Sequence, residues 1–495
     1  MEARRYLILL IAVAAVATCV IPTVPAYGND LTTGPHAAIN DLAFSRVQTW
    51  MGGAAQDPYL KNTGFSTGTT KGCDSSHHLP CDHIAEKTVR DWVIYGGYAA
   101  DTPVDIVLSH GYNPLTGKGW DGIFVGSYQP ATVWTESSLN PYSFPHAKEY
   151  LAKAMAAPTD DDGPGKDALM AYGNAWRSVG ETMHMVSDMT VPSHVWIDRH
   201  PVSDPFEDSM TRNSVIEVKD KPYTRSVDYE AIMKTGTVSP LMKSLANWTY
   251  ANFYSEDTIP DVSADADGYV YRTVDGESVP AARLSLSSII IARDSRSSDG
   301  FSEESMETKT VTAYTVADSR VIEAQKARVI PAAIQGSSMT LYAFLPRLRA
   351  TIDRIVYNPL YGSPQTGQTV IEGSLAHHPT AVWPAAPAIG NGAFIQVNSQ
   401  DPIRVLPAGN GGSADLSKIT YIIPAVPGDR VTLFYDFGGY RIYSEEATVP
   451  PAASLPVTTI TTAAMVTDDG MEYCCGYQNS ACFRPRGSNI GWTCG

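Results

Sequence analysis

Residues 184–194 read HMVSDMTVPSH, and this stretch guides the interpretation of the whole chain. His184 and Asp188 are four residues apart, so on a helix their side chains leave the same face one turn from each other. Pro192 is expected to end that helix, which places His194 in the loop just beyond it. Imidazole and carboxylate groups are ligands that zinc accepts, so the residue types suit a metal site.

A helix carrying this motif is predicted over residues 167–189, which contain no proline and have apolar residues at helical spacing. A lone H-x3-D pair is also typical of the solvated face of a surface helix, and that alternative remains open. Met183, Met185 and Met189 flank the polar residues, which favours a buried face. A buried histidine and aspartate would need partners there.

The first 28 residues carry Arg4 and Arg5 near their start, then an apolar run and then small residues. This order predicts a secretory signal peptide over residues 1–26, with Tyr27 as the first mature residue. We therefore expect a secreted or periplasmic protein. Lipid anchoring at Cys19 is the alternative, although Thr18 is an unusual residue before an acylated cysteine. No later stretch approaches the roughly 20 apolar residues of a transmembrane helix.

Removal of the signal peptide would leave six of the seven cysteines, an even number in an oxidising compartment. A disulfide between Cys73 and Cys81 would close a short loop. The other four cysteines would crosslink the tail, and these are Cys474, Cys475, Cys482 and Cys494. A cysteine zinc site is disfavoured because the sequence has no C-x2-C pair.

At 495 residues the chain is long enough for two or three domains. Its net charge of -16 argues against duplex nucleic acid as the main partner, because such binders usually present a basic face. An acidic enzyme can still act on a nucleotide if metal ions supply the positive charge. Nucleic acid is therefore disfavoured and not excluded.

Periodicity predicts further helices over residues 36–50, 83–100, 144–156 and 321–357. The apolar stretch 286–293 is expected to be a buried segment. Beyond residue 358, alternating stretches such as TYIIPAV and RVTLFYDF, with turns at 409–412 and 427–428, indicate β structure. The expected architecture is a mainly α catalytic domain over residues 27–357, followed by a smaller β-rich C-terminal domain over 358–495 with a cysteine-rich tail.

The stretch HMVSDMTVPSH resembles the H-x3-D-x5-H core of the zinc-dependent phospholipase C family, which is related to the fungal single-strand-specific zinc nucleases. In that family the first histidine and the aspartate bind part of a tri-zinc cluster, and the last histidine binds another zinc. The resemblance implies the helical fold of these enzymes and two or three Zn²⁺ ions per chain. It assigns His184, Asp188 and His194 as metal ligands.

The resemblance implies further ligands at matching positions. His36, in GPHAAINDLA, matches a ligand histidine on the first helix, and Tyr27 matches the first mature residue, usually tryptophan, whose amino group and carbonyl bind metal. Asp101 matches an aspartate that follows a helix. His110, in LSHGYNP, matches a loop histidine, with a backbone-bonded loop histidine as the alternative.

The family's last ligand pair, H-x3-E, is matched imperfectly. Glu207 in SDPFED aligns with the glutamate, but Ser203 stands at the histidine position. His200 and Asp204 lie close by and are the candidates for the missing ligand. The third zinc site is therefore a second departure from the family pattern, after the tyrosine at position 27.

The resemblance, which covers roughly residues 27–207, implies a phospholipase C that releases diacylglycerol and a phosphorylated head group. It implies a phospholipid substrate at a membrane surface, and Asp101 and Asp188 as catalytic residues. One alternative is a single-strand nuclease or nucleotidase, which exposed aromatic residues such as Tyr112 and Trp120 would favour. Another is a non-catalytic zinc-binding surface protein. The sequence has no G-x-S-x-G, Walker or H-E-x-x-H motif.

Overall fold

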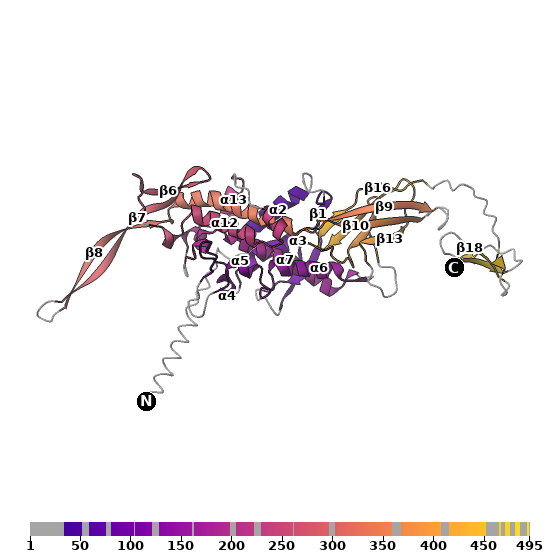
Figure 1. Ribbon diagram of the computed structural model, residues 1–495, viewed down its shortest axis with the longest axis horizontal. Helices are drawn as coiled ribbons and strands as arrows, with labels where there is room; N and C mark the ends of the chain where they lie inside the picture. Colours follow the sequence, from indigo (N-terminus) through magenta and orange to yellow (C-terminus); the bar gives the residue numbers. More distant parts are fainter. Residues whose placement is uncertain are drawn as a thin grey trace, which may run out of the picture.

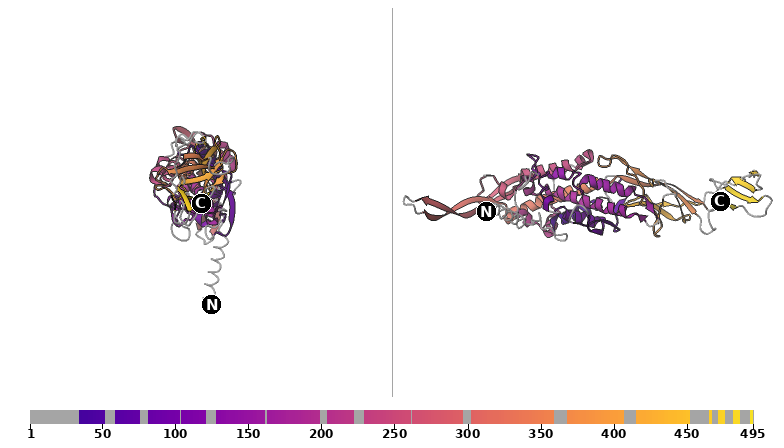
Figure 2. Two further views of the ribbon diagram at one scale, coloured as in Figure 1. Left: turned by 90° about the vertical axis from the view of Figure 1, so that its right-hand side faces the viewer. Right: turned by 90° about the horizontal axis from the view of Figure 1, so that it is seen from below.

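The protein is described by a computed structural model, in which helices form the middle of the molecule and β structure extends from both ends (Figure 1). The right-hand view of Figure 2 shows the same elongated arrangement from below, and the left-hand view looks along the long axis. The described residues are 34–51, 59–75, 81–102, 104–120, 128–160, 163–198, 204–221, 229–260, 262–296, 302–358, 368–406, 415–451, 465–466, 471–475, 481–485 and 493–494. The expected signal peptide, with Cys19, and Tyr27 lie outside these residues.

Helix α7 (Lys166–Asp188) is the central element of the helical region. Among helices it packs mainly against α2 (Pro35–Met51), α3 (Val89–Ala99), α6 (Phe144–Ala156) and α13 (Ser319–Phe344), and it also contacts α12 (Ser239–Asn252). Every residue of α7 from Ala175 to Asp188 is buried. A helix that is covered on all sides is expected at the centre of a large core, so the polar residues of HMVSDMTVPSH lie inside the protein.

Glycines allow α3 and α7 to approach each other closely. A Cβ atom on Gly180 would lie 2.3 Å from the carbonyl oxygen of Val93, and one on Gly96 would lie 2.3 Å from that of Arg177. Asn40 on α2 donates to the carbonyls of Val93 (2.9 Å) and Gly180 (3.0 Å) and so links all three helices.

The other described helices lie between α3 and α13 in the sequence. They are α4 (Val104–Val107), α5 (Ala131–Trp134), α8 (Pro192–Trp196), α9 (Pro205–Asp208), α10 (Arg212–Val218), α11 (Tyr229–Thr235), α12 (Ser239–Asn252) and the 3₁₀ helix η1 (Glu256–Thr258). Pro192 does more than follow α7, because it occupies the first turn of α8, where its missing N–H costs nothing. His194 therefore lies on a short helix and not in the expected loop.

Two expected helices are wrong in extent. The stretch predicted as helix over 83–100 begins as a strand, β3 (Ile84–Thr88), and α3 starts only after Thr88, whose side chain caps it by accepting from the N–H of Asp91. The helix predicted over 321–357 ends at Phe344. Leu345 is extended because it precedes Pro346, and the chain continues as a strand.

Two antiparallel sheets hold most of the strands that follow α13, together with β1, and we call them the β-rich region. The first has the order β1-β15-β14-β11-β12, with β16 also paired to β14, and the second has the order β13-β10-β9. The strands of the first are β1 (Thr63–Phe65), β15 (Tyr440–Tyr443), β14 (Arg430–Phe437), β11 (Ala393–Val397), β12 (Ile403–Arg404) and β16 (Ala447–Thr448). Those of the second are β13 (Lys418–Ile423), β10 (Gln368–His377) and β9 (Leu348–Asn358).

These sheets include strands that precede residue 358. Phe65 of β1 pairs with Tyr440 of β15, and β9 pairs with β10 in antiparallel register. The expected strands TYIIPAV and RVTLFYDF correspond to β13 and β14. The chain therefore combines a helical region with β-rich regions, while a division into domains at residues 357 and 358 remains a prediction.

The remaining strands form small sheets and a long hairpin. The hairpin β7 (Glu277–Arg296) with β8 (Ser302–Thr315) extends from the end of the molecule where β6 (Tyr269–Val274) lies (Figure 1). The apolar stretch 286–293 is part of β7. The other pairs are β2 (Thr69–Cys73) with β3, β4 (Thr159–Asp160) with β5 (Gly163–Pro164), and the tail strands β17 (Met465–Val466), β18 (Met471–Cys475), β19 (Ala481–Pro485) and β20 (Thr493–Cys494).

The disulfide between Cys73 and Cys81 is present. In the tail, Cys482 lies opposite Cys474 and Cys494 in strand register, but the pairing of the tail cysteines remains a prediction. Among the described residues, no helix is both long enough and apolar enough to span a bilayer.

Candidate metal centre

Seven of the residues singled out in the sequence meet in one buried cluster. They are His36, Asp101, His110, His184, Asp188, His194 and Glu207, and none is more than 5% exposed. They come from α2, the turn after α3, the loop after α4, and helices α7, α8 and α9. Tyr27 and His200 lie outside the described residues. We call these seven residues the cluster.

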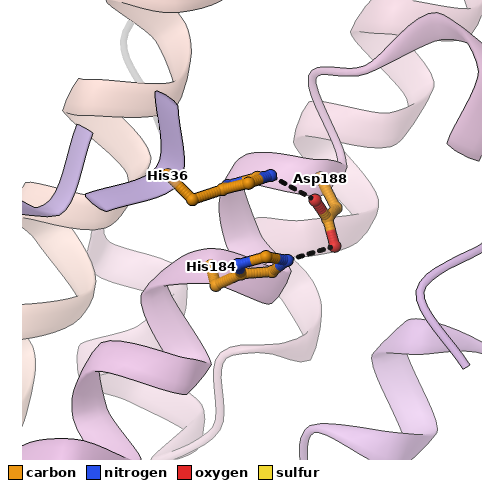
Figure 3. Close-up of side chains that lie close together, drawn as sticks. All are labelled: His36, His184 and Asp188. Carbon is orange, nitrogen blue, oxygen red and sulfur yellow. Dashed lines mark ion pairs between the residues drawn. The ribbon is translucent and has the colours of Figure 1, made fainter. Parts of the chain in front are cut away.

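Asp188 occupies the centre of the cluster. Its Oδ1 lies 3.3 Å from Nε2 of His36, on one side of the carboxylate. Its Oδ2 lies 2.9 Å from Nδ1 of His110, 3.4 Å from Nε2 of His184 and 3.8 Å from Nδ1 of His194. The two oxygens thus face different histidines, as Figure 3 shows for His36 and His184.

Asp101 is the second carboxylate that lies near Nε2 of His184. Its Oδ1 lies 3.3 Å from Nε2 of His184 and 3.6 Å from Nδ1 of His110. Two groups of ligand atoms therefore share His184, one with His36 and Asp188 and one with Asp101 and His110. Within each group all ligand atoms lie within 4.8 Å of one another.

The hydrogen bond on the far side of His184 determines what its Nε2 can do. Its Nδ1 lies 2.8 Å from the carbonyl oxygen of Gly97, which can only accept, so Nδ1 carries a hydrogen. In the neutral ring, Nε2 then presents a lone pair to oxygens of Asp101 and Asp188. Three acceptors that face one another in a buried site require a proton or a cation between them.

The unsatisfied buried atoms fit a metal ion. In the described part of the chain, both carboxylate oxygens of Asp188, Oδ1 of Asp101 and Nε2 of His184 make no hydrogen bond of normal geometry, even where a ring nitrogen is close. Both ring nitrogens of His110 share this property. Imidazole nitrogens and carboxylate oxygens are the donor set that zinc prefers in proteins, so these residues suit a zinc ion.

The electrostatics of the cluster agree with this fit. Burial, together with His184, lowers the pKa of His36 well below its usual value, so this ring is neutral and able to bind metal. Burial alone would raise the pKa of Asp188, but the neighbouring histidines, His184 first, outweigh it and hold that pKa well below the usual range. Burial opposes charge on His184 too, yet Asp101 and Asp188 raise its pKa well above the usual value. Without a metal, His184 therefore holds a proton that a cation would replace.

The remaining pair is His194 and Glu207, whose Nε2 and Oε1 lie 2.8 Å apart. Asp204 is the N-cap of α9, because its Oδ1 accepts from the N–H of Glu207 at 2.8 Å. The ring of Trp120 packs edge-on against His194, with centroids 5.1 Å apart. Ser203 and His200 lie outside the described residues, so the ligands of a third metal position remain a prediction.

Sequence reasoning did not identify two groups that hold the cluster in place. The first is the carbonyl of Gly97, and the second is the hydroxyl of Ser187, which lies 2.8 Å from Nδ1 of His36. A backbone carbonyl leaves no mark in the sequence. Ser187 is adjacent to Asp188, but only the packing of α2 against α7 shows that it reaches His36.

A buried ion pair lies one to two turns before His184 on α7. Arg177 donates to Glu181 (2.8 Å) and to the carbonyls of Cys73 (2.8 Å) and Ser75 (3.1 Å). Burial raises the pKa of Glu181 to about 7, although Arg177 opposes this shift. The pair joins the disulfide-bonded segment to the helix that carries the cluster.

Comparison with known proteins gives little beyond this geometry. No family model matches the chain, and no curated protein matches it. Among solved structures the chain is similar to the alpha toxin from Clostridium absonum, with 10% sequence identity, 94% of this chain and 98% of that chain covered, and a TM-score of 0.31. A TM-score this low carries no argument, so the functional conclusion depends on the site.

Proposed function

We propose that this protein is a secreted zinc-dependent phosphodiester hydrolase, most simply a phospholipase C, with the cluster as its catalytic centre. The observation that carries the proposal is the position of Asp188, buried and ionised, with different histidines facing its two oxygens. A carboxylate placed in this way can bridge two metal ions. The residues that contribute are those that the resemblance to the phospholipase C family assigns.

The donor set supports zinc over the alkaline-earth cations. Magnesium and calcium sites are built mainly from oxygen atoms, whereas four histidines take part here. His184 has one lone pair, on Nε2, so it would bind only one ion, and a second ion beside Asp101 and His110 would use Oδ2 of Asp188 in its place. His194 and Glu207 would contribute to a third, so we propose two or three Zn²⁺ ions per chain.

Zinc in such a site supplies positive charge to phosphate oxygens and lowers the pKa of a bound water from about 15.7 to roughly 7. The protein's own contribution is placement. Asp188 holds the two ligand groups together, and the Gly97 carbonyl fixes the ring of His184. We assign Asp101 as the group that accepts a proton from the attacking water, because its Oδ1 faces the cluster and has no hydrogen-bond partner in the described chain.

The substrate we propose is a phospholipid, cleaved to diacylglycerol and a phosphorylated head group. A nuclease would use the same metal chemistry and would need exposed aromatic rings on which bases could stack. The two candidates for that role are almost buried, with Tyr112 6% and Trp120 9% exposed. Neither residue therefore favours a nuclease over a phospholipase.

The test is zinc content and hydrolysis of p-nitrophenyl phosphocholine by the chain without its first 26 residues, with single-stranded DNA as a parallel substrate. His184→Ala should lose both zinc and hydrolysis. His378→Ala is the control, because His378 is exposed and stacks on Tyr59 outside the cluster. Hydrolysis of DNA alone would redirect the proposal to a nuclease. Absence of zinc from folded, zinc-supplemented protein would overturn it.

A further inference from the structure

Ser187 lies between two residues of the cluster on α7 and contacts a third on α2. Its side chain is buried, with 1% exposed, and its Oγ lies 2.8 Å from Nδ1 of His36. The same Oγ lies 2.7 Å from the carbonyl oxygen of His184, one turn earlier on its own helix. Ser187 therefore makes two hydrogen bonds with a single hydroxyl group.

The direction of these two bonds follows from their chemistry. A hydroxyl has one hydrogen to donate and can also accept. The carbonyl of His184 can only accept, so the hydroxyl hydrogen of Ser187 goes there. The bond to His36 must then run the other way, with Nδ1–H of His36 donating to Oγ of Ser187.

This assignment gives His36 the same orientation as His184. With its hydrogen on Nδ1, the neutral ring of His36 presents the lone pair of Nε2 to Oδ1 of Asp188, 3.3 Å away (Figure 3). His184 does the same with its Nδ1–H on Gly97. The two rings lie stacked, with centroids 3.7 Å apart and 23° between their planes. Two parallel imidazoles thus direct equivalent nitrogens at one carboxylate.

We propose that Ser187 is a positioning residue that holds His36 in the Nδ1–H tautomer and keeps its Nε2 available to a metal ion. The inference rests on the proposed metal centre and adds a residue that selects the state of one ligand. Without the hydroxyl, Nδ1 of His36 loses this acceptor, and the tautomer with hydrogen on Nε2, donated to Asp188, becomes more favourable. A histidine in that state cannot bind metal through Nε2. Mutation of a residue that hydrogen-bonds to a metal ligand typically lowers metal affinity 10- to 100-fold.

The experiment compares Ser187→Ala with Ser178→Ala in the zinc-loaded chain. Ser178 is the matched control, because it is a buried serine of α7 whose Oγ donates to a carbonyl one turn earlier, that of Asn174, at 2.7 Å. Chelator competition measures the affinity of each zinc ion. We expect Ser187→Ala to lower the binding affinity for one zinc ion about 10- to 100-fold, and Ser178→Ala to leave the affinity for every ion unchanged. Ser187→Thr, which keeps the hydroxyl, should restore most of the loss.

A second readout is independent of affinity. Nitrogen-15 NMR of the histidine rings should show a slowly exchanging Nδ1–H on His36 in the wild-type and Ser178→Ala proteins, and faster exchange in Ser187→Ala. Equal zinc affinities and equal exchange in the two alanine variants would overturn the role of Ser187, while zinc in the wild type would leave the proposed function intact. A wild-type chain that binds no zinc would instead overturn the metal centre itself.

Discussion

Replacing Asp188 with asparagine removes the charge at the centre of the cluster and keeps the shape of the side chain. An amide has one oxygen, so it can serve either His36, which faces Oδ1, or the histidines that face Oδ2. A four-ligand zinc site contributes about 10 to 16 kcal/mol, or about 2.5 to 4 kcal/mol per ligand. At about 1.4 kcal/mol per factor of ten, at least one ion should bind about 10²- to 10³-fold more weakly.

The assay is chelator competition followed by elemental analysis of the dialysed protein. Asp436→Asn is the control, because this aspartate pairs with Arg441 in the β-rich region, away from the cluster. We expect the control to keep its zinc and Asp188→Asn to lose at least one ion on dialysis. The reasoning is refuted if Asp188→Asn keeps every ion with wild-type affinity.

Glu181→Ala should destabilise the fold by about 3 to 5 kcal/mol in denaturant unfolding, because it leaves a buried arginine without its carboxylate. Glu149→Ala is the control and should cost about 0.5 kcal/mol or less, because its side chain is 71% exposed. Similar losses in the two variants would contradict this. In zinc-free protein, burial lowers the pKa of His184, but two carboxylates outweigh burial and raise this pKa well above 6.5. The protonated ring therefore stabilises the fold fully below about pH 6.5, and this stabilisation is lost as pH rises through the folded-state pKa. Zinc affinity should increase over the same pH range, and zinc binding should release a proton. Calorimetry in buffers of different ionisation enthalpy measures that proton, and a binding enthalpy that is the same in all buffers would contradict the prediction. Gly180→Ala should cost about 1 to 3 kcal/mol by forcing α3 and α7 apart, whereas Gly165→Ala, with nothing within 4 Å of the added Cβ, should change the unfolding midpoint little.

The sequence predicted those parts of the site that depend on local spacing. His184 and Asp188 are one helical turn apart, so their common direction follows from the helix alone. The position of His36 came from the resemblance to the phospholipase C family, and the structure places it against Asp188. The roles of Ser187 and Gly97 depend on how three helices pack, and no local pattern encodes that packing.

The fold was less predictable where two periodicities overlap. In LRATIDRIVYN, the apolar residues Ile352, Ile355 and Val356 have helical spacing, yet the segment is strand β9 because Pro346 ends the preceding helix and β10 supplies a partner. The stretch before Val89 lies within the helix predicted over 83–100, yet it forms strand β3 and pairs with β2. Strand β1 has only three residues, so it shows no period at all.

The pairing of Phe65 with Tyr440 has a consequence for how the protein is made. Strand β1 leaves the ribosome early, and its partner β15 follows about 375 residues later, which takes roughly 20 to 75 s at about 5 to 20 residues per second. During that interval the edge of β1 is open to other chains or chaperones. A nascent chain that stops before β15 would leave β1 without its partner strand. Limited proteolysis of such truncated chains should cut near β1 first.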